Sequence, residues 1–298
     1  MEPTAAAVPI DIDTLRCRLG GPIELGHRHP LAGGVASPLV EHVEVRAGGR
    51  RADIVVKRCW PAEPVAMRLI ERIANTPAFP ELIDSGVDEH GSWLVMPFYP
   101  GETQSAYDEP PPVVYECLAR MHAIFERAEL PAEIPRFDID WCRRALGDKT
   151  PADLRALRDR EFAARAERLV RTWVDSPLLA RGFDLQPATL LHADVYGNNV
   201  RIGADVRLID WGSARIGPAM LDVALAAGPE SAGLRAYLAA WPGRPLDNRT
   251  VRIGHAWATV VNNAMFVGGV AKRFGSAVGS EMLDHAAAAY HRLAGLLG

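Results

Sequence analysis

The sequence predicts an α+β protein of two lobes, a small antiparallel sheet with one helix followed by a larger, mainly helical lobe. Over the first hundred residues, short apolar runs alternate with glycine-rich breaks, which is typical of strands joined in hairpins. Beyond that point, the apolar residues recur at helical spacing. Pro97 and the pair Pro100-Gly101 separate the two patterns. We therefore expect one lobe over residues 1–97 and the other over residues 98–298.

Five strands and one helix are expected in the first lobe. The helix is predicted from Pro61 to Ile73, where apolar side chains follow a helical rather than an alternating pattern. Gly48 and Gly49 supply the tight turn between the second and third strands. Residues 1–12 are expected either to be unstructured or to pair with the sheet. The strands are predicted at 23–25, 39–45, 54–57, 81–86 and 93–96.

Helices are predicted through most of the second lobe. Thr150 and Pro151 are the expected N-cap and first-turn proline of a long polar helix that runs to about Val174. Alanine-rich segments at 249–274 and 281–297, each apolar on one side, predict two more helices. An earlier helix is predicted by four apolar residues on one face, namely Val114, Leu118, Met121 and Phe125.

The composition is that of an ordinary globular protein, with 48% hydrophobic and 23% charged residues. The formal net charge is −4 and no basic stripe is present, so we expect no nucleic-acid partner, because phosphate contacts need clustered lysines and arginines. No apolar run approaches 18 residues, and the first residues lack the charged and apolar regions of a signal peptide. We therefore expect no membrane span.

The cysteines are scattered along the chain, with no CxxC pair and no spacing typical of zinc ligands. We expect them to be individual reduced thiols, which favours a cytoplasmic location. They are Cys17, Cys59, Cys117 and Cys142.

The segment HADVYGNN, from His192 to Asn199, carries the chemistry. Its His, Asp and Asn stand at HxDxxxxN spacing after an apolar approach, which is the layout of kinase catalytic loops. Asp194 can accept or orient the proton of a substrate hydroxyl, and Asn199 can offer an amide oxygen to magnesium. Three positions form only a moderately specific motif alone, so the segments around them must support this interpretation.

A predicted hairpin follows, with strands at 200–202 and 206–209 joined by a turn that contains Gly203 and Asp205. Its open end brings Asn199 beside Asp210, in the triplet Asp-Trp-Gly. A carboxylate and a neutral amide oxygen are hard ligands suited to Mg²⁺ that bridges phosphate oxygens. The pattern therefore predicts a magnesium site made by these two residues.

Two segments resemble the aminoglycoside phosphotransferase and choline kinase family. They are HADVYGNN and IDWGSARIGPAMLDVA, in which Asp210 stands 16 residues after Asp194. The resemblance covers most of the chain and implies a bilobal, protein-kinase-like fold. It implies that Asp194 is the catalytic base, that Asn199 and Asp210 bind Mg²⁺, and that Asp222 is structural. It further implies that His192 supports the loop by hydrogen bonding.

Lys57, at the end of the strand Ile54-Val55-Val56-Lys57, resembles the lysine that holds the α- and β-phosphates of ATP in kinases. Two carboxylates on the following helix are candidates for its partner. Glu63 fits the family's ExxxLxxL register, whereas Glu71 has the more usual separation from the lysine. We favour Glu63.

Two further segments are expected to bind the nucleotide. A glycine-rich turn between the first two strands, with Gly33, Gly34 and Ser37, lets backbone N–H groups approach phosphates closely, although it lacks the protein-kinase GxGxxG. The segment Trp93 to Phe98 resembles the family's hinge, in which Met96 and Phe98 are expected to contact adenine. Pro97 removes one hydrogen-bond donor from this hinge.

The sequence thus predicts a kinase that transfers the γ-phosphoryl of MgATP to a hydroxyl of a small molecule. The short stretch between Asp210 and Asp222 has no long activation loop, which disfavours a protein substrate. An antibiotic, as in resistance kinases, is the first choice of acceptor, and choline, an amino alcohol or a sugar is the second. The alternative from another class is a pseudokinase that binds nucleotide without turnover. Acidic residues that could neutralise an amino sugar, or be surface charges, are Asp138, Asp140, Glu230 and Asp284.

Overall fold

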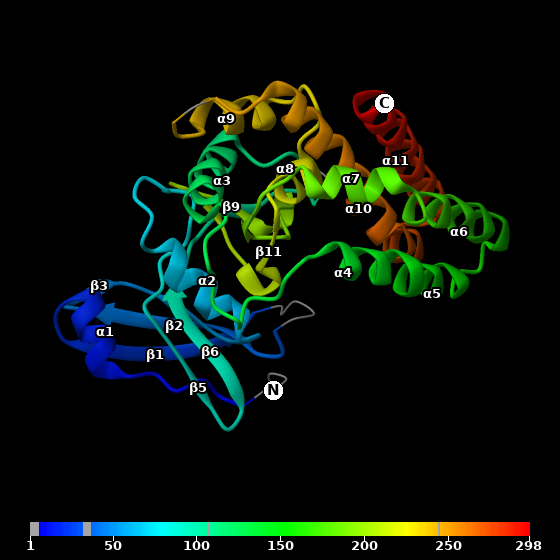
Figure 1. Ribbon diagram of the computed structural model, residues 1–298. Coiled ribbons are helices and arrows are strands. Elements are labelled where there is room, and N and C mark those ends of the chain that lie inside the picture. The colour runs from blue at the N-terminus through cyan, green and yellow to red at the C-terminus, as the bar shows by residue number, and fades with distance from the viewer. Residues whose placement is uncertain (1–5, 32–36, 107, 244) are drawn as a thin grey trace.

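The structure is a computed structural model that describes residues 6–31, 37–106, 108–243 and 245–298. A small sheet lobe lies at one end of the molecule, and a larger helical lobe, coloured from green to red, lies beside it (Figure 1). The bilobal α+β fold is therefore confirmed. We propose the boundary between the lobes at residues 97 and 98, where the last large strand ends.

The first lobe is an antiparallel sheet in the order β1-β2-β4-β6-β5, with β3 paired to β2. Every strand predicted in this lobe is present, although the one expected at 81–86 begins later. The predicted helix is α2, Ala62–Ile70. The strands are β1 Ile23–Pro30, β2 Val40–Ala47, β3 Arg50–Arg51, β4 Ile54–Cys59, β5 Asp84–Asp88 and β6 Gly91–Pro97.

The central strand β4 is buried on both faces, which positions its lysine. Ile54 and Val56 pack in a core on the outer face of the sheet, whereas Val55 and Cys59 belong to the core that continues into the helical lobe. Because side chains alternate along a strand, Lys57 lies on the same face as Val55 and points between the lobes.

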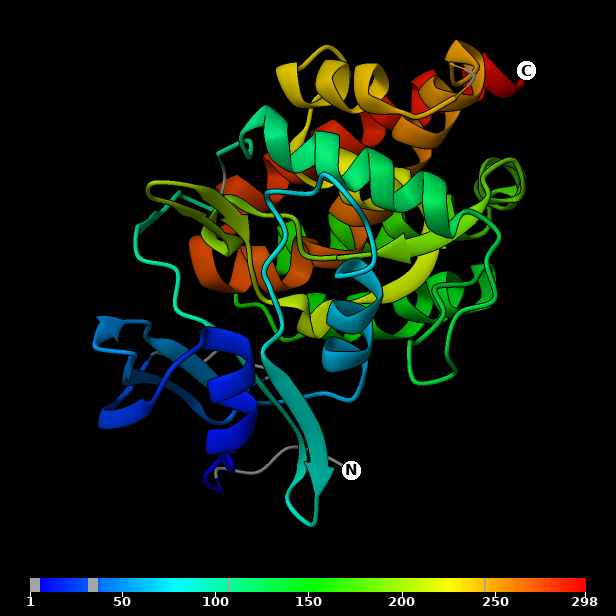
Figure 2. The same cartoon turned by 90° about the vertical axis from the view of Figure 1, so that its left-hand side faces the viewer.

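An additional helix, α1, Ile12–Leu19, covers the outer face of the sheet and was not predicted. Asp11 caps it by accepting hydrogen bonds from the backbone N–H groups of Asp13 and Thr14, and Leu15 packs into the outer core. The residues before it are tied to the sheet by the buried guanidinium of Arg58, which donates to the carbonyl oxygens of Ala6 and Ala7. Figure 2 shows α1 on the side of the sheet away from α2.

The second lobe consists of helices around a few short strands. The predicted helices at 249–274 and 281–297 are present as α10 and α11, which pack along each other. The helices are α3 Pro112–Phe125, α4 Ile139–Arg144, α5 Thr150–Arg155, α6 Arg160–Val174, α7 Pro177–Asp184, α8 Met220–Ala226, α9 Ala232–Ala240, α10 Asn248–Phe274 and α11 Ser276–Leu297, with a π-helical stretch at Ala145–Lys149. The strands are β7 Glu102–Thr103, β8 Ala188–Leu191, β9 Val200–Ile202, β10 Val206–Leu208 and β11 Arg215–Pro218.

The predicted N-cap at Thr150 and the long helix to Val174 are wrong. Thr150 is buried and continues the π-helical stretch, with its hydroxyl donating to the carbonyl oxygen of Ala145 at 3.2 Å. The helix ends after Arg155, and a new helix begins where Asp159 accepts from the backbone N–H of Phe162 at 3.0 Å. An aspartate cap therefore divides one predicted helix into α5 and α6.

The core of the helical lobe is built around Trp257 of α10, which is fully buried. Its indole N–H donates to the carbonyl oxygen of Leu179 at 2.8 Å, and its ring lies against Gly182 of α7.

Among the residues that the structure describes, no helix has both the length and the apolar character needed to cross a bilayer.

The contact between Trp257 and Gly182 predicts opposite effects for two glycine-to-alanine changes. In Gly182→Ala, the new Cβ lies 2.7 Å from Trp257 Cδ1, so we expect the free energy of unfolding to fall by about 1–3 kcal/mol through overpacking. Gly269 in α10 has no heavy atom within 4 Å of an added Cβ, so Gly269→Ala should raise it by about 0.5–1 kcal/mol. Urea denaturation of both variants measures the difference, and equal shifts in the same direction would contradict the packing described here.

Candidate active site

The loop that carries Asp194 follows β8, which pairs with β11 in the interior of the helical lobe. His192 Nε2 donates to the carbonyl oxygen of Ile209 at 3.0 Å, and His192 Nδ1 accepts from the backbone N–H of Asp194 at 3.2 Å. Both nitrogens of the imidazole ring therefore hold the loop in place. This arrangement agrees with the supporting role that the resemblance implies for His192.

Asp222, in the first turn of α8, is fully buried and braces the same loop. Its two oxygens accept from the backbone N–H groups of His192 at 2.8 Å and Ala193 at 2.7 Å. Ala193 has a φ of 63°, in the left-handed region that is costly for a residue other than glycine. His122 Nε2 also bonds to Asp222 at 3.2 Å, and His122 Nδ1 bonds to the hydroxyl of Tyr237 at 3.0 Å. The buried carboxylate is thus fully hydrogen-bonded.

Asp194 and Asn199 are joined by hydrogen bonds from one amide group. Asn199 Nδ2 donates to Asp194 Oδ2 and to the Asp194 carbonyl oxygen, both at 2.8 Å. Burial raises the pKa of Asp194, and the carboxylate of Asp210 adds to the rise, while His192 and Asn199 oppose it. Because Nδ2 faces Asp194, Asn199 Oδ1 is the amide atom that can serve as a metal ligand.

The β9–β10 hairpin, which is present as predicted, brings Asn199 next to Asp210. The backbone N–H of Ile209 donates to the carbonyl oxygen of Asn199 at 2.8 Å. Asp210 itself has a φ of 63°, a left-handed conformation that is uncommon outside glycine and often marks functional sites. The two predicted magnesium ligands therefore lie on adjacent segments, and both offer the hard oxygen atoms that Mg²⁺ prefers.

Lys57 lies between two carboxylates, one from each lobe. Its Nζ is 2.8 Å from Glu63 Oε1 and 2.5 Å from Asp210 Oδ1, and the side chain is almost fully buried. Glu63, rather than Glu71, thus contacts the lysine. Glu71 instead accepts from the backbone N–H of Leu82 at 3.3 Å.

The pKa values in this cluster follow from burial and from the charge of the lysine. Burial raises the pKa of Glu63, and the ammonium of Lys57 opposes the rise. For Asp210, burial also raises the pKa, but Lys57 more than offsets it and the net shift is downward. Burial lowers the pKa of Lys57, and the two carboxylates reverse that shift, so the lysine stays charged.

A cavity of about 210 Å³ lies between the sheet and the β9–β10 hairpin, next to this cluster. Ser37 faces it, and the Ser37 hydroxyl is buried without a hydrogen-bond partner among the described residues, as expected of a group that meets a ligand. Gly33 and Gly34 lie outside the described residues. The cavity is lined by Leu31, Ser37, Val40, Val55, Lys57, Met96, Phe98, Tyr99, Arg201, Ile209 and Asp210.

The segment expected as the hinge forms one wall of this cavity, with Met96 and Phe98 both lining it. The backbone N–H of Phe98 donates to the carbonyl oxygen of Asp53 at 2.9 Å, and Pro97 has no N–H. Neither Pro97 nor Phe98 therefore offers a free backbone N–H to a ligand in this cavity. His42 stacks on Phe98 with ring centroids 4.2 Å apart and also bonds to Asp53, which fixes this wall from behind.

A second cavity of about 230 Å³ opens on the other side of Asp194, within the helical lobe. Arg215 and Trp141 line it, and the Arg215 guanidinium lies 5.5 Å from the centre of the Trp141 ring. The cavity is lined by Phe137, Trp141, Ala145, Lys149, Ala193, Asp194, Ser213, Arg215, Leu221, Leu225, Asn262, Met265 and Phe266. Asp194 lines this cavity, and its hydrogen-bond partner Asn199 is bonded to Ile209, which lines the cavity beside Lys57.

Sequence reasoning did not find Arg215 or Arg201 as residues of these cavities. Both stand within a few residues of Asn199 or Asp210, and this proximity was the available clue. The sequence alone does not tell to which side a side chain on a short strand points, so it could not place these two arginines in the cavities.

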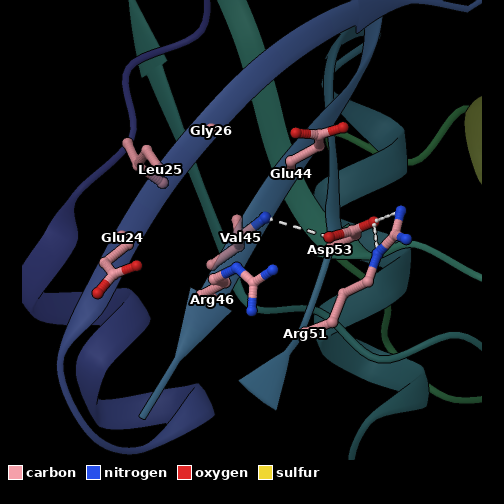
Figure 3. A pocket seen from close by; sticks show the side chains of 8 residues that line it. All are labelled: Glu24, Leu25, Gly26, Glu44, Val45, Arg46, Arg51 and Asp53. Atoms are coloured by element: carbon pink, nitrogen blue, oxygen red, sulfur yellow. Dashed lines mark hydrogen bonds and ion pairs between the residues drawn. The ribbon is translucent and has the colours of Figure 1, made fainter. Parts of the chain in front are cut away.

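A third hollow lies at the bulge where β1 shifts its register against β2 (Figure 3), and Asp53 at this hollow lies on the same face of the sheet as His42. Figure 3 shows Asp53 at its edge, accepting from Arg51 and from the backbone N–H of Val45. Burial raises the pKa of Asp53, but these donors and His42 outweigh it and lower the pKa to about 2. The Asp53 carboxylate is already satisfied by its donors, and its bond to His42 holds that ring where it stacks on Phe98.

The cluster around Lys57 predicts a pH-dependent defect in Lys57→Met. Without the ammonium, Glu63 is buried and uncompensated, so its folded-state pKa rises further above the ordinary value of 4.5. Glu63 then loses its proton at a lower pH in the unfolded chain than in the folded one. The free energy of unfolding therefore falls as the pH rises above about 4.5. We expect a loss of about 3–5 kcal/mol at pH 8 that shrinks at pH 5.

Urea denaturation at the two pH values checks this expectation. The double variant Lys57→Met with Glu63→Gln is the control, and it should lose the part of the pH dependence that Glu63 contributes, leaving the part from Asp210, which also loses its cation. An equal loss of stability at pH 5 and pH 8 in the single variant would disprove the account of Glu63.

The arrangement of loop, lysine and hairpin can be compared with known proteins. The family model described as the phosphotransferase enzyme family matches residues 32–257. No curated protein gave a match. Among solved structures, a choline/ethanolamine kinase family protein from Mesorhizobium loti is 16% identical, with a TM-score of 0.55 over 91% of this chain and 88% of that chain.

Two antibiotic kinases have a similar fold. Spectinomycin phosphotransferase, solved with ADP and spectinomycin, is 13% identical, with a TM-score of 0.54 over 97% of this chain and 99% of that chain. An aminoglycoside phosphotransferase from Alicyclobacillus acidocaldarius is 15% identical, with a TM-score of 0.53 over 98% and 96%. These likenesses establish a protein-kinase-like fold. Because the family model spans most of the chain, the protein belongs to the phosphotransferase enzyme family, the aminoglycoside phosphotransferase and choline kinase group that its motifs resemble, and is a small-molecule kinase.

Proposed function

We propose that this protein transfers the γ-phosphoryl group of MgATP to a hydroxyl group of a small molecule. The observation that carries the proposal is the position of Asp194, which lines one cavity and is hydrogen-bonded through Asn199 to the segment that lines the other. A nucleotide in the cavity beside Lys57 and an acceptor in the cavity beside Arg215 would meet at Asp194. In-line transfer needs this arrangement of donor, acceptor and base.

In this proposal, Lys57 binds the α- and β-phosphates, and Glu63 holds the lysine from behind. The Lys57 ammonium keeps its charge, so it offsets the negative charge of the phosphates. Ser37, whose hydroxyl has no hydrogen-bond partner in the described part of the chain, donates to a phosphate oxygen. Met96 and Phe98 form the apolar wall for adenine. Gly33 and Gly34 are proposed, from the sequence, to bind the phosphates through their backbone N–H groups.

Magnesium is held by Asn199 and Asp210 in this proposal. Their oxygen atoms are of the type that Mg²⁺ prefers, and the remaining positions would be taken by phosphate oxygens and water. When bound, the ion supplies positive charge that stabilises the transferring phosphoryl group. The protein's own part is to hold the two oxygens on adjacent segments through the Ile209–Asn199 hydrogen bond.

Asp194 orients the acceptor hydroxyl and takes its proton as the phosphoryl group transfers. Burial and the Asp210 carboxylate raise the pKa of Asp194, which makes it a better proton acceptor than an exposed aspartate. The Asn199 amide holds one carboxylate oxygen, which leaves the other to face the acceptor cavity. The two carboxylates thus have different tasks, because only Asp210 is paired with a cation.

A hydroxylated antibiotic is the acceptor we propose first, with a metabolite such as choline, an amino alcohol or a sugar as the alternative. Solved structures with this fold come from both groups, since one is a choline/ethanolamine kinase family protein and another is a spectinomycin phosphotransferase in complex with spectinomycin. We further propose a cytoplasmic location, supported by the four cysteines, which are free thiols.

Asp194→Ala should retain nucleotide binding and lose phosphoryl transfer. Removing a general base typically costs about 10²–10⁴-fold in kcat. A coupled ADP-release assay with MgATP measures turnover against hydroxylated antibiotics, choline-like amines and sugars, and calorimetry with a non-hydrolysable ATP analogue measures binding. Asp205→Ala, in the exposed turn of the β9–β10 hairpin, is the matched control and should be fully active. Wild-type turnover in Asp194→Ala would refute the assigned role.

Asp210→Asn should uncouple nucleotide binding from Mg²⁺. The wild-type protein is expected to bind the ATP analogue about tenfold or more tightly with Mg²⁺ than with a chelator, because Asp210 would hold the ion and the ion would offset the charge of the phosphates. In the variant, the two affinities should become similar. Titration calorimetry with and without Mg²⁺ measures the change, with Asp205→Asn as control. A variant that keeps the full Mg²⁺ dependence would show that Asp210 is no ligand.

A further inference from the structure

We propose that the acceptor is a hydroxylated molecule with an apolar, ring-sized body and an anionic group such as a carboxylate, and not a polycationic aminoglycoside. This inference rests on the proposed function, because it assigns the substrate class of the cavity beside Asp194. It is carried by the charges, the apolar lining and the size of that cavity.

The first observation is the charge of the lining. Of the residues that line the cavity, three are ionisable, namely Asp194, Lys149 and Arg215. Asp194 is assigned to the transfer itself, so the other two leave a cationic wall. A polycation buried here would have no further carboxylate among the lining residues to offset the cost of its desolvation.

The acidic residues considered from the sequence do not line this cavity, and three of them have other partners. Asp138 caps α4 by accepting from the backbone N–H of Trp141 at 2.6 Å. Asp140 is exposed and lies 3.6 Å from Arg143 in the next turn. Asp284 pairs with Arg165 at 2.8 Å on the surface, and Glu230 is exposed before α9.

The second observation is the way Arg215 is held. Its Nε donates to the carbonyl oxygen of Ser213 at 3.0 Å, and its guanidinium lies over the ring of Trp141. Among the described residues, no carboxylate lies within the 4 Å of an ion pair with Arg215, although the side chain is half-buried. A fixed, half-buried guanidinium that faces a cavity is suited to bind a carboxylate, because its planar N–H groups match the two oxygens.

Lys149 adds a second cation at the rim. Its side chain is 67% exposed and pairs with Asp153 at 3.0 Å, so its field at the cavity is weaker than that of Arg215. Ala145 and Lys149 are the two ends of the π-helical stretch, and both line the cavity. Such stretches often occur at functional sites, because they redirect side chains that a regular helix would point elsewhere.

The third observation is the apolar body of the cavity. Its volume of about 230 Å³ is below the range of roughly 300–1,000 Å³ that is usual for drug-sized ligands, which favours a compact body. Phe137 and Trp141 lie with ring centroids 4.7 Å apart on one side. Leu221, Leu225, Met265 and Phe266 complete a lining that suits an aromatic or alicyclic ring better than a string of amino sugars.

The test compares three probes that share one ring and one primary alcohol, namely 4-(hydroxymethyl)benzoate, the matching benzamide and the matching benzylamine. Ligand-observed NMR titration measures their affinities for the full-length protein with Mg²⁺ and a non-hydrolysable ATP analogue. We expect the carboxylate to bind about tenfold more tightly than the amine, as for a hydrogen-bonded charge pair. Arg215→Gln should remove this preference, and Lys149→Gln should reduce it by less.

Arg165→Gln, a surface arginine of the same lobe, is the matched control and should keep the preference. Because Lys149 is exposed, its variant remains informative even if Arg215→Gln fails to fold. Equal binding of the three probes, tighter binding of the amine, or binding of none would overturn the anionic acceptor.

The outcomes also separate this inference from the proposed function. Phosphoryl transfer to the amine or to aminoglycosides alone, lost in Asp194→Ala, would leave the kinase function standing and refute the anionic acceptor. Binding of the ATP analogue is measured before any acceptor is added, and failure to bind it would refute the kinase function itself.

Discussion

A lysine ammonium buried between two carboxylates links the lobes of this protein. Lys57 belongs to the sheet, Glu63 to the helix beside it, and Asp210 to the start of the segment after the β9–β10 hairpin. Isolated in a protein interior, each charge would be costly, so the three must stay together for any one of them to remain ionised. This requirement sets the position of the sheet lobe against the hairpin, and with it the cavity that lies between them.

Asp222 plays the equivalent part inside the helical lobe. It accepts hydrogen bonds from the backbone of His192 and Ala193, and so holds the loop that carries Asp194 in a conformation that is costly for a residue other than glycine. Asp194 is thereby fixed at the wall of the cavity beside Arg215. The activity proposed here depends on these two buried carboxylate networks, since one positions the nucleotide side of the site and the other positions the base.

The two cavities differ in a way that bears on specificity. The cavity beside Lys57 has the lysine, a hydroxyl and apolar walls, as a nucleotide requires. The cavity beside Arg215 is apolar with cations at its edge. Solved structures of the same fold include a choline/ethanolamine kinase family protein and an aminoglycoside phosphotransferase. A shared fold therefore leaves the acceptor open, and the side chains of the helical lobe determine it.

The sequence by itself determined the parts of this protein that depend on local spacing. Alternating and helical patterns were enough to predict the sheet, α2, α3, α10 and α11, and the spacing from His192 to Asp210 predicted a catalytic loop followed by a hairpin. Only the tertiary structure decided between Glu63 and Glu71, divided the helix at Asp159, and placed Arg215 over Trp141. These outcomes depend on which side chains from distant segments meet in the interior, and local propensity carries no information about such contacts.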